Sequence, residues 1–165
     1  MNPIEWLRTK GFASLPQEEL DAILHFALLW SLFEAKVLDM RASASSILEV
    51  STRWEHDGLL KAASFRSDFL YFQSRYFENE EFTHNFASLN FRGNDNQQLV
   101  EAVLKGEKED IGAITAALLI IVYRLRNNLF HGLKWADGIR GQLDNFTHAN
   151  SLLMLALDLN ESPVR

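Results

Sequence analysis

The chain has 165 residues, a formal net charge of −6 and a hydrophobic content of 47 %. This composition excludes long intrinsic disorder, and the length fits a single domain, residues 1–165, with a core of its own. The lack of cysteine excludes disulfides and thiolate metal sites, and the acidic balance argues against broad electrostatic binding of nucleic acid.

Hydrophobic periodicity predicts four or five helices. The first spans residues 16–40, where apolar side chains recur almost all the way round, so we expect it to be central and buried. Ser14 with Gln17 fits a capping box at its start. Residues 41–58 are ambiguous, because a short helix, a continuation of the first helix and extended chain all remain open.

A second long helix is expected at residues 59–77, and residues 82–96 should be largely loop. A short helix at residues 97–105 should stop at the following glycine. Residues 110–130 then form a strongly apolar helix, and residues 142–159 form the last one. Because strand alternation is not convincing anywhere, these elements predict an all-α helical bundle.

We expect neither a signal peptide nor a membrane span. The first 15 residues contain Arg8 and Lys10 but no apolar core. The longest apolar run, residues 116–123, is far shorter than the ~20 residues that cross a bilayer. The sequence therefore predicts a soluble protein without a membrane partner, and the absence of cysteine is compatible with the cytoplasm.

The end of the helix at residues 110–130 carries the candidate chemistry. Four residues separate Arg126 from His131, and Asn127 directly follows the arginine. Five steps of an ideal helix turn through about 500°, so these side chains would lie roughly 140° apart. They converge only if the helix ends or distorts between them, or if a second copy of the chain supplies one of them.

An arginine and a histidine suit the cleavage of RNA without a metal ion. A neutral imidazole takes the proton of a ribose 2′-OH, and an imidazolium protonates the leaving oxygen. A guanidinium binds phosphate oxygens and stabilises the charge that grows in the transition state. The structural alternative is that such residues only cap a helix end and match its dipole.

A local basic patch surrounds this pair. The stretch between residues 121 and 141 contains a single acidic residue. Its basic residues are Arg124, Arg126, Lys134 and Arg140. One interpretation is that Arg124 and Lys134 bind or position an RNA substrate. The other is that basic residues collect near a helix C-terminus, where the macrodipole favours them.

The chain resembles HEPN domains in two short stretches. The Arg-x(4–6)-His signature of that family, commonly written with a polar residue after the arginine, is matched by Arg126-Asn127-Asn128-Leu129-Phe130-His131-Gly132. The first core helix of some bacterial members is similar to Leu29-Trp30-Ser31-Leu32-Phe33-Glu34-Ala35. The size and the predicted helical content also agree with the family.

The resemblance implies a HEPN-like bundle that dimerises with its two motifs facing each other. It implies a metal-independent endoribonuclease, a toxin or defence effector, whose partners are RNA, a second copy of the chain and a cognate antitoxin, and which needs no cofactor. His131 would be the acid/base residue, Arg126 the phosphate and transition-state stabiliser, and Asn127 a positioning group. The products would carry a 2′,3′-cyclic phosphate and a 5′-hydroxyl.

Two other functions stay open. The family includes members that have lost activity, so the chain could be a non-catalytic HEPN-like module that binds a nucleotide or RNA or docks a partner. It could also be a helical adaptor in which Arg126 and His131 only cap a helix. The intact pair favours an enzyme, whereas the net charge of −6 favours the other two.

Glu34 lies within the apolar stripe of the first helix, where a buried carboxylate needs a partner. It orients Arg126 or His131 in one interpretation, and in the other it forms an ion pair elsewhere or turns to solvent. The remaining histidines show no metal-binding spacing. His25 is expected to be a core histidine, and the i, i+4 spacing of Asp144 and His148 suits a pair on one helix face.

Overall fold

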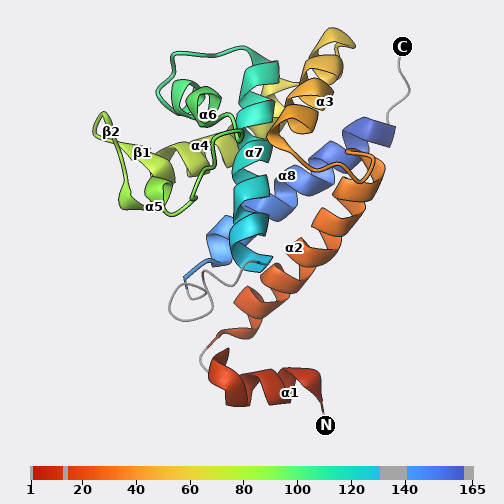
Figure 1. The fold of residues 1–165 in the computed structure, drawn as a ribbon, viewed down its shortest axis with the longest axis vertical. Helices are drawn as coiled ribbons and strands as arrows, with labels where there is room; N and C mark the ends of the chain where they lie inside the picture. Colours follow the sequence, from red (N-terminus) through yellow and green to blue (C-terminus); the bar gives the residue numbers. More distant parts are fainter. Residues whose placement is uncertain (1, 13–14, 131–140, 162–165) are drawn as a thin grey trace.

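The computed structural model describes residues 2–12, 15–130 and 141–161. Within these ranges the protein is all-α, with eight α-helices, one π-helical segment and a single two-stranded hairpin (Figure 1). This confirms the predicted fold class. The helices outnumber the predicted four or five because the chain also contains short ones, which periodicity over a long window does not detect.

The N-terminal segment stands apart from the rest of the molecule (Figure 1). It consists of α1 (Pro3–Leu7), which has no buried residue, and the π-helix η1 (Arg8–Phe12). The first long helix, α2 (Gln17–Lys36), has Pro16 at its N-cap and no side-chain cap. The predicted capping box is therefore wrong, and its Ser14 lies outside the described residues.

α2 ends four residues earlier than predicted. Asp39 and Met40 both have positive φ angles, 50° and 60°, which an α-helix cannot accommodate. The chain turns there and enters α3 (Ala44–His56), so the ambiguous segment is a separate helix. A capping box formed by Ser43 and Ser46 fixes the start of α3.

α4 (Ala62–Tyr76) leads directly into a small antiparallel hairpin of β1 (Phe77–Glu78) and β2 (Glu81–Phe82). The two residues between the strands, Asn79 and Glu80, have φ angles of 52° and 63°, as a type I′ turn requires. Strands of two residues are too short to show alternation, which is why the sequence did not predict them.

The predicted loop after the hairpin contains the single-turn helix α5 (His84–Ala87). The next helix, α6 (Gln97–Leu104), ends as predicted before Gly106, whose φ of +75° suits the position after a helix. The two remaining helices are α7 (Ile111–Phe130) and α8 (Leu143–Glu161), each within two residues of the predicted bounds.

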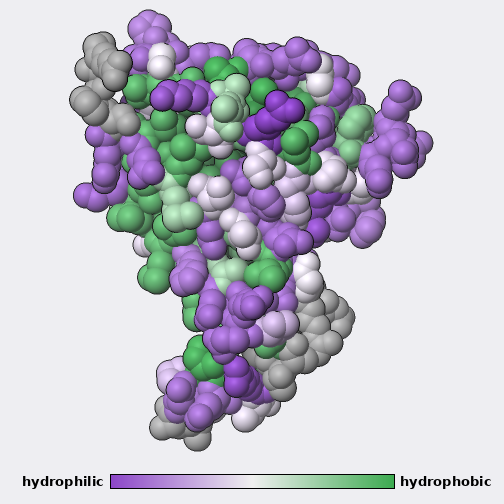
Figure 2. Space-filling view, turned by 180° about the vertical axis from the view of Figure 1, so that it is seen from behind, coloured by the Kyte–Doolittle hydropathy of each residue, from purple (hydrophilic) through white to green (hydrophobic). Residues whose placement is uncertain are grey.

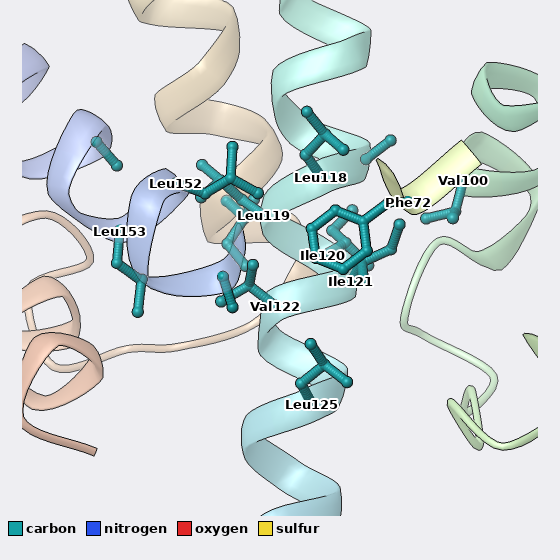
Figure 3. Packing of buried hydrophobic residues seen from close by; sticks show 14 of the residues in the cluster. Phe72, Val100, Leu118, Leu119, Ile120, Ile121, Val122, Leu125, Leu152 and Leu153 are labelled. Carbon is teal, nitrogen blue, oxygen red and sulfur yellow. The ribbon is translucent and has the colours of Figure 1, made fainter. Parts of the chain in front are cut away.

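α7 passes through the centre of the molecule and forms the axis of the core (Figure 1). Figure 3 shows its middle turns between side chains of α8 on one side and of α4 and α6 on the other. By length and composition α7 could cross a membrane, but 78 % of its most apolar window is buried inside the protein. Such burial is typical of the core helix of a soluble protein.

Candidate functional site

The second half of α7 leaves one narrow face uncovered. Between residues 121 and 130 every side chain is buried except those of Tyr123, Arg126 and Phe130. Their spacing of three and four residues places them on the same face of the helix. An otherwise buried helix therefore presents an aromatic ring, a guanidinium and a second aromatic ring.

α2 supplies the carboxylate that faces this arginine. The indole N–H of Trp30 donates to Oε2 of Glu34 at 2.9 Å, and the same oxygen lies 3.7 Å from Nη2 of Arg126. The second distance makes an ion pair but is too long for a hydrogen bond. Because the Arg126 and Glu34 side chains are 30 % and 21 % exposed, the pair lies at the surface rather than in the core.

Asn127 fixes the guanidinium from the side of α7. It is buried, and its Oδ1 accepts a hydrogen bond from Nη1 of Arg126 at 3.0 Å. The guanidinium carbon also lies 5.8 Å from the ring centre of Trp30 and 5.4 Å from that of Phe130. Both distances fall within the range of cation–π attraction. The side chain is thus oriented by contacts on several sides.

Arg126 retains hydrogen-bonding capacity that the described residues do not use. Its Nε is buried without a hydrogen-bond partner among them, and Nη2 meets Glu34 only at the longer distance. The buried Nε is shielded from a ligand in solvent, whereas the Nη groups at the end of a partly exposed, planar guanidinium can donate to a phosphate. The geometry therefore supports an anion-binding role for this residue.

His131 and Lys134, the other predicted residues of this segment, lie outside the described residues. The roles predicted for His131 and Lys134 therefore stay predictions. Arg140 of the predicted basic patch falls in the same segment, residues 131–140.

Arg124 does not belong to the candidate site, which corrects the prediction that it binds substrate. Its side chain is only 2 % exposed, and its Nη1 lies 2.9 Å from Oδ2 of the buried Asp95. Its Nε and Nη2 donate to the carbonyls of Leu89 and Asn90 at 3.0 and 2.6 Å. Burial lowers the pKa of this guanidinium, although the charge of Asp95 opposes the shift. Arg124 therefore anchors the loop before α6.

Asn128 reinforces the same anchor and was not predicted from the sequence. It is buried, and its Nδ2 donates to the carbonyls of Ser88 and Leu89 at 2.9 and 3.2 Å. Because its partners are backbone atoms about 40 residues away, no local pattern indicates this role. The polar residues after Leu125 thus lie on two sides of α7, with Arg126 on the partly exposed side and Asn128 on the buried side.

A second polar cluster joins α4 to α8. Nδ1 of His148 lies 2.7 Å from Oδ1 of the buried Asp68, and the hydroxyl of Ser151 donates to the other oxygen of that carboxylate at 3.0 Å. The Tyr71 ring stacks on the imidazole at 4.1 Å. His148 therefore pairs with a residue of another helix, and the predicted pair with Asp144 is wrong.

The other histidine prediction is also corrected, because His25 is exposed on α2 rather than buried in the core. Over residues 2–12, 15–130 and 141–161, no group of three histidine or carboxylate side chains is placed to hold a metal ion. The arrangement around Arg126 is consequently the site that the described residues support best.

Comparisons with known protein families, curated proteins and solved structures find no match for this chain. The resemblance to HEPN domains thus depends on two short stretches of the sequence, residues 29–35 and 126–132. In the fold these stretches meet, since Glu34 of the first contacts Arg126 of the second. Nothing in the sequence pattern of either stretch alone requires this contact.

Proposed function

We propose that this protein is a metal-independent endoribonuclease of HEPN type that acts as a homodimer in the cytoplasm. One observation carries the proposal: α7 ends in an oriented, partly exposed and incompletely bonded guanidinium, that of Arg126, five positions before His131. This is the pairing of a phosphate-binding cation with an acid/base group that RNA cleavage without a metal needs.

In the proposed reaction the imidazole of His131 takes the proton of a ribose 2′-OH. The 2′-oxygen then forms a bond to the adjacent phosphorus, and the bond to the 5′-oxygen breaks. An imidazolium, of the same or the second copy, returns a proton to that leaving oxygen. Arg126 neutralises the charge that grows on the non-bridging oxygens, while Asn127 and Glu34 hold its guanidinium in place.

The surface of α2 supports the homodimer. Leu24, Leu28 and Leu32 are exposed, Leu28 by 72 %, and their spacing of four residues places them along one stripe. In Figure 2 hydrophobic residues gather along the left edge of the molecule, where α2 and α8 lie. A two-fold contact through this stripe would pair α2 of the two copies, while Glu34, six positions after Leu28, lies about 120° around the helix from it.

The decisive experiment is cleavage of labelled structured and unstructured RNAs by the purified protein in excess chelator. Wild type should cut and leave 2′,3′-cyclic phosphate and 5′-hydroxyl ends, whereas Arg126→Ala and His131→Ala should fail. The matched controls Arg66→Ala and His56→Ala remove the same residue types from exposed positions on α4 and α3, so they should cut normally.

Three outcomes would contradict the proposal. Complete loss of activity in chelator would exclude the metal-independent mechanism. Equal cleavage by wild type and by both site variants would place the activity elsewhere. A stable monomer that cuts at full rate would show that activity does not need a dimer. The sharper test of the dimer is Leu28→Glu, because a charge in the stripe should yield a folded, inactive monomer.

The second candidate function is a non-catalytic module that binds RNA or a nucleotide, and the net charge of −6 favours it. This module and the enzyme share the anion-binding guanidinium but differ in the need for His131. Binding of a non-cleavable RNA that depends on Arg126, together with no cleavage of the matching cleavable strand, would establish the module in place of the enzyme.

A further inference from the structure

Phe130, the last residue of α7, has a large ring in an exposed position. It is 57 % exposed, although almost all of the other apolar residues of this helix are buried. Its ring centre lies 5.4 Å from the guanidinium carbon of Arg126, which contacts the Trp30 ring as well. An exposed aromatic ring beside a partly exposed cation offers a π-face that water solvates poorly.

The two side chains are placed for the two parts of a single nucleotide. They lie one helical turn apart, about 6 Å along the axis, on the face of α7 that nothing in the described structure covers completely. A nucleotide holds its base and its phosphate on opposite sides of the ribose. A base on Phe130 therefore leaves the adjoining phosphate within reach of Arg126.

The charge of the protein makes such stacking important. With a net charge of −6, the chain gains little affinity for RNA from general electrostatics. Stacking on an aromatic ring contributes affinity that is independent of net charge and tolerant of sequence, because every base has a π-face. That face is free only in an unpaired nucleotide, since neighbours cover it in a duplex.

Building on the proposed function, we infer that Phe130 and Arg126 together bind one unpaired nucleotide, with its base stacked on Phe130 and its phosphate on Arg126. Phe130 is then a specificity-determining residue that restricts cleavage to single-stranded RNA, loops and bulges. It does not take part in proton transfer, so its removal weakens binding and leaves the chemical step in place.

The test uses a short 2′-O-methyl oligoribonucleotide, which binds but cannot be cut, as a single strand and as a full duplex. Phe130→Ala should weaken single-strand binding by about five-fold to a hundred-fold, the range seen when a base–aromatic stack is removed, and leave duplex binding unchanged. Phe130→Trp should bind at least as well as wild type. Leu70→Ala, which shortens another half-exposed apolar residue, is the control.

With the cleavable single strand, Phe130→Ala should raise KM by a similar factor and change kcat by less than about three-fold, the pattern for lost uniform binding. Wild-type binding by Phe130→Ala would overturn the inference, and so would a change of its dimer into a monomer, because the ring would then belong to the subunit interface. If Arg126-dependent cleavage persists in either case, the proposed function stands. If wild type neither binds nor cuts any RNA, both fall.

Discussion

Two arginines of α7, two positions apart, illustrate two uses of the same side chain. Arg124 is buried, paired with Asp95 and bonded to two carbonyls, so its hydrogen-bonding groups are directed to the protein. Arg126 is partly exposed, bonded to its neighbour Asn127 and only loosely paired with Glu34. The closed side of α7 stabilises the fold, and the open side carries the charged group that we propose binds a ligand.

The largest expected effect tests the closed side. Arg124→Met should lower the free energy of unfolding by about 3–5 kcal/mol, because it leaves the carboxylate of Asp95 buried without its charged partner, with the backbone N–H of Arg92 still donating to it. Arg126→Met, the matched change on the open side, should cost no more than about 1 kcal/mol, as for a surface pair. Urea unfolding of both variants measures the difference, and equal losses would abolish the contrast between the two sides.

The next effect concerns the open side alone. Arg126→Lys keeps the charge but loses the planar fork that binds two phosphate oxygens at once. We expect kcat for RNA cleavage to fall by about a hundred-fold to a thousand-fold, with an unchanged melting temperature. Single-turnover kinetics and thermal unfolding give the two values. A lysine variant that cuts at the wild-type rate would reduce the role of Arg126 to its charge.

A pH effect of similar size should arise in the core, at the buried Tyr76 of α4. Burial raises the pKa of Tyr76 to about 12 from its ordinary value of 10.0, with Arg75 acting in the opposite direction. Below pH 10 both folded and unfolded states carry the protonated phenol, and between pH 10 and 12 only the unfolded state releases its proton. Stability should therefore fall by about 2–3 kcal/mol over this range.

Unfolding by urea at pH 8 and near pH 11 measures about half of this loss, ~1.4 kcal/mol, with Tyr76→Phe as the control. The variant has no phenol to ionise, so its stability should decline less steeply than that of wild type. Parallel curves for the two proteins would show that the pKa of Tyr76 is not raised in the folded state.

The smallest expected effect separates orientation from stability at Glu34. Glu34→Gln keeps an oxygen that accepts from the indole of Trp30 but removes the charge that faces Arg126. We expect kcat to fall a few-fold, about 1 kcal/mol in activation free energy, and the free energy of unfolding to change by less than that. In a cycle with Arg126→Lys, simple additivity of the two losses would show that the carboxylate does not act through the guanidinium.

Local periodicity alone predicted the all-α fold and the approximate bounds of α6, α7 and α8. It did so because a helix repeats its apolar positions every three or four residues, within a short window of sequence. The same local information failed at the β1–β2 hairpin, whose strands are too short to show any period. It also placed the end of α2 too late, because two left-handed residues interrupt a pattern that remains hydrophobic.

The candidate site likewise has features that local sequence determines and features that distant partners decide. The sequence by itself determined that Arg126 and Asn127 lie near a helix end with His131 four positions after Asn127 in the chain, and that Arg124 lies roughly 200° around the helix from Arg126. It could not determine which arginine is buried, because the deciding partners are distant: Asp95 for Arg124 and Glu34 for Arg126. Helical spacing fixes which residues share a face, but only packing against other elements decides which face meets the core and which meets the solvent.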